Sequence, residues 1–317
     1  MIRNTDIDVL YESFCNGIPP EARAVARTLA FRLKLVPQPG IPWSEVFQHR
    51  ITLQAPAFFA EGMPQIGAEN ECRAVLAHML AVIEAFGTDR ISDRQTEDDP
   101  ALRNMLGLAR AARNSALDTL GSPEAVAVAE QADKDTLAAI ATERSTLLSG
   151  EPIDFGAYER ISAGKQAVGL PASLALAKAA GWDPQRCESV RTVLMGVWLG
   201  LQFQDDVMDW EDDVTRGGAW AVSLARAVNG TALDGADPAR LRTGVLSSGV
   251  LAEMLRLAYE RFHTARSESE TLGANELAVW LRAREDQARD SHLRELGSPG
   301  YFLRLRKLAP WANEVLA

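Results

Sequence analysis

Cysteine, histidine and long apolar runs are scarce in this 317-residue chain, which holds 3 Cys and 4 His. The cysteines, Cys15, Cys72 and Cys187, lie far apart without a CxxC pair, so a disulfide framework is not expected. The histidines show no HxxxH or HExxH spacing, which excludes the usual zinc hydrolase motifs. No uncharged apolar run approaches the ~18 residues of a membrane span, and the acidic N-terminus is unlike a signal peptide. We therefore expect a cytoplasmic protein without a transmembrane segment.

Basic residues are too few to balance the acids. Lys and Arg total 33 against 43 Asp and Glu, a net charge of -10. A field of that sign repels phosphate backbones, so we expect no nucleic-acid partner. An anionic substrate would need local compensation by metal ions or by a few well-placed cations.

Runs of alternating β-branched residues are almost absent, whereas Ala, Leu, Arg and Glu recur with a period of about 3.6 residues. This pattern predicts an all-α protein. No linker rich in Pro, Gly or Ser divides the chain, so we expect one helical domain over residues 1–317. The expected helices are Thr5–Asn16, Pro20–Leu35, Trp43–Ala60, Ala68–Asp93, Pro100–Leu120, Pro123–Leu148, Phe155–Ala180, Pro184–Asp213, Ala219–Val228, Arg240–Thr264, Glu276–Leu296 and Tyr301–Leu316.

The most unusual stretch is an acidic run that begins at Asp205, in which six of nine residues are acidic, at the end of a long apolar segment. On a helix, Asp205, Asp209 and either Asp212 or Asp213 share one face, with Asp206 at its edge. Their carboxylates repel one another, and the dipole of a helix C-terminus adds to the repulsion, so we expect a compensating cation. Carboxylates without His or Cys favour a hard cation such as Mg²⁺. The alternative is a solvated acidic helix end.

The sequence LQFQDDVMD, which begins at Leu201, resembles the second aspartate-rich motif, FQxxDDxxD, of the trans-isoprenyl diphosphate synthases and related class I terpene synthases. Leu201 stands where that family has Phe. Upstream, Tyr158 and Lys165 resemble the family's Y…KT element, with Gln166 in place of Thr. The resemblance implies a single large helical bundle of the isoprenoid synthase type with a central active-site well. It also implies several Mg²⁺ ions that bridge to a diphosphate, and a homodimer.

The family also has a first aspartate-rich motif, DDxxD, on an earlier helix. Its best match here is Asp89-Arg90-Ile91-Ser92-Asp93, with Arg90 at the second position. The alternative is an Asp/Arg-rich helix end that forms surface ion pairs. A rival run, Glu97-Asp98-Asp99, precedes Pro100, and we interpret it as the N-terminal cap of a helix. The resemblance thus implies a set of catalytic, metal-binding carboxylates: Asp89, Asp93, Asp205, Asp206 and Asp209, with Asp213 as an additional ligand.

Five further residues are candidates for substrate binding. Lys165, Gln202 and Arg94 would contact the diphosphate and its hydration shell. Phe86 and Trp198 lie about one and two helical turns before the acidic residues, where an aromatic face can stabilise a carbocation. Core packing is the alternative role for both aromatic side chains.

Chain-elongating synthases of this family carry an Arg-Arg pair after the first motif and an N-terminal GGKxxR element, which hold isopentenyl diphosphate. Here Arg94 is followed by Gln-Thr-Glu-Asp-Asp, and neither element is present. We therefore expect Mg²⁺-dependent ionisation of an allylic prenyl diphosphate by a terpene synthase. One alternative is a prenyltransferase, a trans-polyprenyl diphosphate synthase that joins the prenyl cation to isopentenyl diphosphate or another acceptor. The other alternative is a non-catalytic subunit of a prenyl synthase.

Overall fold

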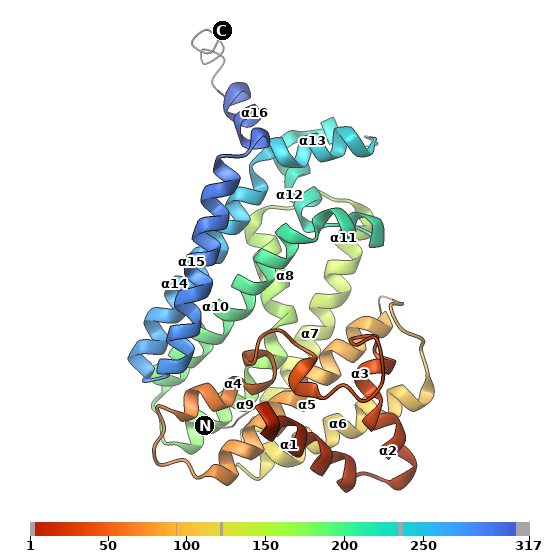
Figure 1. Cartoon of the computed structure of the whole chain (residues 1–317), viewed down its shortest axis with the longest axis vertical. Coiled ribbons are helices and arrows are strands. Elements are labelled where there is room, and N and C mark those ends of the chain that lie inside the picture. Colours follow the sequence, from red (N-terminus) through yellow and green to blue (C-terminus); the bar gives the residue numbers. More distant parts are fainter. Residues whose placement is uncertain (1–3, 93, 121–122, 234–236, 309–317) are drawn as a thin grey trace. The chain divides into compact units, whose positions relative to one another are not determined.

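A computed structural model describes residues 4–92, 94–120, 123–233 and 237–308, and every regular element in these ranges is a helix (Figure 1). The expected all-α class is confirmed. The α-helices are α1 (Asn4–Gly17), α2 (Pro20–Arg27), α3 (Leu29–Arg32), α4 (Ile51–Ala60), α5 (Ala68–Ser92), α6 (Pro100–Asp118), α7 (Pro123–Ser149), α8 (Phe155–Lys165), α9 (Pro171–Ala179), α10 (Pro184–Met208), α11 (Trp210–Arg216), α12 (Trp220–Asn229), α13 (Pro238–Ser248), α14 (Val250–Leu272), α15 (Asn275–Leu296) and α16 (Pro299–Leu308). The short 3₁₀ turns are η1 (Trp43–Glu45), η2 (Ala167–Gly169) and η3 (Gly230–Leu233).

The chain divides into two compact units, each made of three segments. Unit 1 comprises Met1–Leu137, Gln166–Leu194 and Glu268–Leu277, and unit 2 comprises Ala138–Lys165, Met195–Ser267 and Ala278–Ala317. The single domain over residues 1–317 stays a prediction. Within the described ranges, no helix combines the length and the apolar character that a membrane crossing requires.

Unit 1 is built around α5, which packs against α4, α6 and α9. Eleven residues of α5 between Ala74 and Gly87 are buried, on all sides of the helix, as expected of a helix inside a bundle. The adjoining core contains aromatic side chains from α1 and η1, where the Tyr11 ring lies 5.3 Å from that of Trp43. This packing fixes the direction of α5 and with it the position of Asp89 in its last turns.

The predicted helix Trp43–Ala60 is wrong in its first half, because α4 begins only at Ile51. At the start of the segment, Asp8 of α1 accepts hydrogen bonds from the backbone nitrogen and the hydroxyl of Ser44, at 3.1 and 2.6 Å, which hold the short turn η1. Inside α4, Pro56 has no N–H to donate to the Thr52 carbonyl. That carbonyl lies 3.1 Å from Nε2 of the fully buried His78 on α5, so His78 satisfies it.

Three other predicted helices are each split in two. Pro20–Leu35 is interrupted at Thr28, whose hydroxyl donates to the Ala24 carbonyl at 2.9 Å and competes with the backbone. Phe155–Ala180 is interrupted before Pro171, which begins α9 because it lacks an N–H. Arg240–Thr264 is interrupted at Gly249, whose φ of +81° is easy only for glycine.

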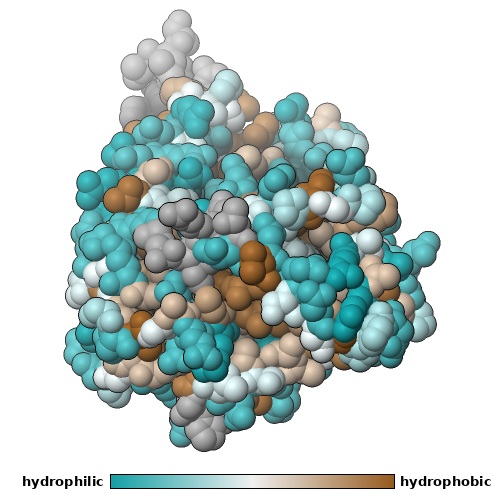
Figure 2. Space-filling view, turned by 60° about the horizontal axis from the view of Figure 1, so that its bottom comes forward, coloured by the Kyte–Doolittle hydropathy of each residue, from teal (hydrophilic) through white to brown (hydrophobic). Residues whose placement is uncertain are grey.

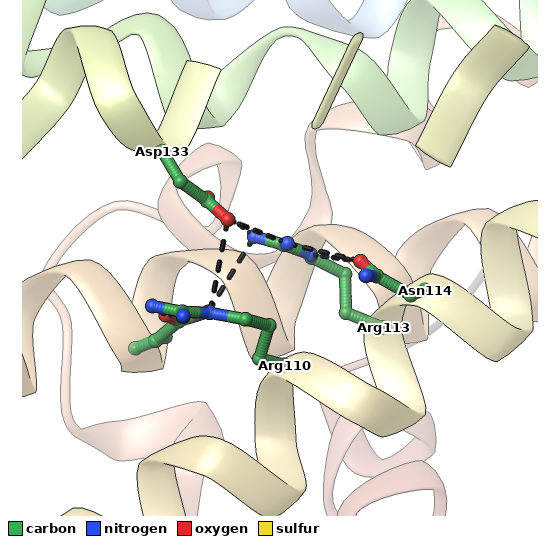
Figure 3. Close-up of polar contacts among 5 residues, drawn as sticks. Arg110, Arg113, Asn114 and Asp133 are labelled. Carbon is green, nitrogen blue, oxygen red and sulfur yellow. Dashed lines mark hydrogen bonds and ion pairs between the residues drawn. The ribbon is translucent and has the colours of Figure 1, made fainter. Parts of the chain in front are cut away.

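A closed network of charges ties three helices of unit 1 together (Figure 3). Arg113 of α6 is only 1% exposed and binds both oxygens of Asp133 on α7, at 2.6 and 2.7 Å. Its other contacts are Asn114 and Glu84, the latter a buried residue of α5 that also pairs with Arg110. Arg113 thus compensates two acids that are largely shielded from water, where an unpaired charge would be very costly, and the exposed Arg110 adds a second cation.

Unit 2 depends on a close approach between α10 and α14. A Cβ atom at Gly196 would lie 2.8 Å from the Arg261 carbonyl oxygen, and one at Gly200 would lie 2.6 Å from the ring of buried Phe262. The two glycines are four residues apart, so they form one smooth stripe on α10. Only glycine allows α14 to pack this closely, and the packing supports the part of α10 that leads into the acidic run.

The face of the molecule in Figure 2 is mostly hydrophilic, with hydrophobic residues in small groups. Scattered apolar side chains are normal on a protein surface. We therefore assign no partner to them.

Candidate active site

The acidic run lies at a break between two helices. We predicted one helix over Pro184–Asp213, but α10 ends at Met208 and α11 begins at Trp210. Asp209 leaves the helical region with φ −107° and ψ 4°, although its N–H still bonds to the Asp205 carbonyl at 2.9 Å. Repulsion among carboxylates one turn apart opposes a continuous helix here, and the break accompanies the burial of Trp210.

Asp206 is buried, and both of its oxygens are engaged. The Tyr158 hydroxyl of α8 donates to Oδ2, and Gln202 Nε2, one turn earlier on α10, donates to Oδ1 at 2.9 Å. Burial raises the pKa of Asp206 to about 7, although both hydrogen bonds stabilise the ionised form. Burial likewise raises the pKa of Tyr158, which therefore keeps its proton and acts as the donor. This contact brings together the two sequence elements that carry the family resemblance.

Lys165 pairs with an acid that the sequence analysis did not single out. Lys165 lies two turns after Tyr158 on the same side of α8, and its ammonium forms an ion pair with Oε2 of Glu143 on α7. The Trp220 indole nitrogen of α12 donates to Oε1 of Glu143 at 3.0 Å. In sequence, Glu143 is one of many charged residues on a long helix, and nothing in its spacing distinguishes it.

The remaining acids of the run have few cations beside them. Asp205 and Asp209 are exposed, and Asp213 is half-buried. Partial desolvation and the charge of Asp209 raise the pKa of Asp205. Partial desolvation also raises the pKa of Asp213, against the opposing effect of Arg216, whose guanidinium lies 3.5 Å from it. One added cation would stabilise the ionised forms of these neighbouring carboxylates.

Asp205, Asp209 and Asp213 fit a hard divalent cation in donor chemistry, since they are carboxylates without His or Cys. Asp206 fits such an ion less well, because Tyr158 and Gln202 already engage its two oxygens. In the part of the chain that the structure describes, no three Asp, Glu, His or Cys side chains converge closely enough to enclose a metal by themselves. Water or a phosphate oxygen would have to complete the coordination, as is usual for Mg²⁺.

The candidates in and around the first aspartate-rich motif lie in unit 1. Asp89 is half-buried on α5, and Arg90 donates to the Lys34 carbonyl at 3.4 Å. Asp93 lies outside the described residues. Arg94 is exposed and adopts a left-handed backbone conformation with φ +56°. Phe86 is 38% exposed and its ring packs 5.0 Å from that of Phe47.

The rival acidic run has a structural role. Asp99 caps α6, where its side chain accepts from the Ala101 N–H at 2.9 Å, and it pairs with Arg32 at 3.2 Å. Asp98 pairs with Arg103. The predicted N-terminal cap is therefore confirmed.

Trp198, the aromatic candidate of unit 2, is 8% exposed on α10. It lies on the turn of α10 that precedes Gln202 and two turns before Asp205. Its role toward a carbocation stays a prediction.

Comparison with known proteins gives a likeness in structure alone. No family model matches the chain, and no curated protein matches its sequence. The heptaprenyl diphosphate synthase of Staphylococcus aureus superposes with a TM-score of 0.71 at 10% identity, over 90% of this chain and 98% of that one. The geranylgeranyl pyrophosphate synthase of Lactobacillus brevis gives 0.66 at 12% identity, over 89% and 96% of the two chains.

A third structure was determined with ligands. The polyprenyl synthase of Caulobacter crescentus, solved as a complex with calcium and isoprenyl diphosphate, superposes with a TM-score of 0.63 at 16% identity, over 87% of this chain and 94% of that one. Likeness at such low identity establishes architecture, and it extends over nearly the whole length of each protein. The chain therefore has the all-α fold of the prenyl diphosphate synthases.

Proposed function

We propose that this protein is a Mg²⁺-dependent prenyltransferase, which ionises an allylic prenyl diphosphate and joins the prenyl group to an acceptor. The observation that carries the proposal is the contact of Tyr158 with Asp206, because it unites the two resembling motifs within a fold shared with prenyl diphosphate synthases. The fold favours this function over the terpene synthase that the sequence alone led us to expect.

The proposed chemistry needs charge compensation on the leaving diphosphate. Bound Mg²⁺ would stabilise the negative charge that develops as the allylic C–O bond breaks. Asp205 and Asp209, with Asp213, would hold the ions directly or through water. Asp206 would fix the end of α10 through its bonds to Tyr158 and Gln202, so that the neighbouring acids keep their positions.

The remaining candidates extend this proposal. On the resemblance, Asp89 and Asp93 would be metal ligands of the first aspartate-rich motif, and Arg94, which is exposed, would contact the diphosphate. On the resemblance, Phe86 and Trp198 would each present an aromatic face to a prenyl carbocation. The proposal assigns these roles from the resemblance, on the positions that match it.

A terpene synthase remains the second candidate because of one observation near Arg94. The residues that follow Arg94 make structural contacts. The buried Thr96 hydroxyl donates to the Arg32 carbonyl at 2.6 Å, and Asp98 and Asp99 form ion pairs. No second arginine stands there to hold the diphosphate of isopentenyl diphosphate. An enzyme without that anion site would quench the cation internally or with water.

Product analysis separates these functions. The full chain is incubated with Mg²⁺ and farnesyl diphosphate, with and without isopentenyl diphosphate, and the organic extract is analysed. A longer prenyl diphosphate that forms only with isopentenyl diphosphate supports the prenyltransferase. A hydrocarbon or alcohol in both reactions supports the terpene synthase. Absence of diphosphate release from geranyl, farnesyl and geranylgeranyl diphosphate contradicts both and favours a non-catalytic subunit.

We also propose a homodimer, on the family resemblance. Light scattering during size-exclusion chromatography should then give twice the chain mass of 34.5 kDa. A value equal to one chain would contradict the dimer and leave the proposed reaction unaffected.

A further inference from the structure

Glu143 places a negative charge beside the cation that is expected to bind the diphosphate. One of its oxygens pairs with the Lys165 ammonium, and the other accepts from the Trp220 indole N–H at 3.0 Å. Trp220 is itself buried, at 4% exposed, so it holds the carboxylate from the protein interior. Both oxygens of Glu143 are thus engaged, and its position is fixed by two elements besides its own helix.

The ion pair of Lys165 and Glu143 is partly buried but still accessible to solvent. The side chains of Lys165 and Glu143 are 20% and 15% exposed, so their mutual attraction is less screened than that of a surface pair. Both charges act on Asp206, which Lys165 stabilises in its ionised form and Glu143 destabilises. Glu143 also acts in the same sense on Asp213. The pair therefore lies within electrostatic range of the acidic run.

The negative charge of Glu143 opposes the binding of an anion to Lys165 in either of two ways. A lysine ammonium has three donors, so Lys165 can keep Glu143 while it binds a phosphate oxygen, or it can leave Glu143 for the phosphate. In the first case Glu143 repels the anion, and in the second the ion pair must be broken. Both cases weaken the binding of diphosphate.

We propose that Glu143 is a positioning residue that holds Lys165 in place and sets how weakly the site retains diphosphate. The inference rests on the proposed function, since it takes diphosphate as the leaving group. Its consequence for a turnover cycle is that diphosphate, once formed, is not trapped by the lysine. The ligand is a multiply charged phosphate anion, and the charge that opposes its binding is the carboxylate of Glu143.

The test compares Glu143→Gln with the wild type. Glutamine keeps a carbonyl oxygen for the Trp220 N–H and removes the charge, so the structural contact is preserved. Calorimetric titration with inorganic diphosphate in the absence of metal should show binding about fivefold tighter, the factor that corresponds to about 1 kcal/mol. The gain should vanish when Lys165→Gln is combined with Glu143→Gln, because the two residues act as a coupled pair. Glu124→Gln, which removes the exposed partner of Lys178, is the matched control and should change nothing.

A second measurement does not depend on diphosphate. The rate at which an amine-acylating reagent modifies Lys165, followed by mass spectrometry, should rise severalfold in Glu143→Gln and stay at the wild-type value in Glu124→Gln. An unchanged rate overturns the inference whatever the protein catalyses. If Lys165→Gln binds diphosphate more weakly than the wild type does, Lys165 contributes to binding. Diphosphate binding by Glu143→Gln that is then no tighter than that of the wild type also overturns the inference. Faster acylation in Glu143→Gln would confirm that Glu143 restrains Lys165. If no variant binds diphosphate, that second result contradicts the proposed function.

Discussion

Tyr158 and Asp206, 48 residues apart in sequence, meet in a buried hydrogen bond from the tyrosine hydroxyl to Oδ2 of the carboxylate. The contact joins α8 to the end of α10, where the acidic run begins. Gln202 completes the arrangement on the other oxygen. Through this bond, the element that carries Lys165 is fastened to the element that carries the acids.

Tyr158→Phe should lower the free energy of unfolding by about 1–3 kcal/mol, because it leaves a buried carboxylate oxygen without its donor. The ring still fills its place against Phe203 and Trp220, whose centroids lie 5.2 and 5.3 Å from it, so no cavity contributes. Urea denaturation measures the effect. A loss that is no larger than that of an exposed variant such as Arg191→Ala would show that the hydrogen bond contributes little.

Arg113→Met should destabilise unit 1 by about 3–5 kcal/mol, since it leaves Asp133 and Glu84 short of their buried counter-ion. Arg103→Met is the matched control on the same helix. The pair of Arg103 with Asp98 is exposed, so its loss should cost about 1 kcal/mol or less. Equal losses in the two variants, measured by thermal and urea unfolding, would contradict the importance that we assign to the buried network.

His78 should make the protein less stable in acid. Burial lowers its pKa from 6.5 to about 4 against the smaller opposing effect of backbone hydrogen bonds, and Nε2 carries the proton because the Thr52 carbonyl can only accept. Between these pKa values the unfolded chain binds a proton that the folded chain refuses, so stability falls as the pH decreases through this window. The contribution lost by pH 4 is about 3 kcal/mol.

The check is a series of urea unfolding curves between neutral pH and pH 4 for the wild type and His78→Gln. Glutamine retains a donor for Thr52 and does not titrate. The variant should be less stable than the wild type at neutral pH, with a smaller decline on acidification. Parallel pH profiles for the two proteins would show that His78 does not titrate as described.

Local pattern was enough to predict several of the longer helices, since α5, α6, α7 and α15 begin and end within a few residues of the expected positions. Asp99 was also predicted correctly, because a cap is a local feature of sequence. The errors had both distant and local causes. The carboxylate of Asp8 holds the turn at Ser44, and the interruption at Thr28 depends on a side chain that competes with its own backbone.

Only part of the candidate site could be predicted from the sequence. The acidic run, Tyr158 and Lys165 were found because a motif has fixed spacing. The pairing of Lys165 with Glu143 could not be found in this way, since the two residues belong to different helices and only folding brings them together. The break at Asp209 was missed because we expected a bound cation, and not an interruption of the helix, to relieve the repulsion between these carboxylates.

Metal-dependent ionisation is the central claim, and diphosphate release tests it most directly. Geranyl, farnesyl and geranylgeranyl diphosphate are each incubated with the full chain and Mg²⁺, with Asp205→Ala and Asp212→Ala beside the wild type. Asp212 belongs to the same acidic run but is 73% exposed and lies beside Arg216. We expect release that requires Mg²⁺ and persists in Asp212→Ala. In Asp205→Ala the rate of release should fall by at least about a hundredfold, which corresponds to a loss of about 3 kcal/mol of transition-state stabilisation. Release without metal, or equal release by wild type and Asp205→Ala, would contradict the claim.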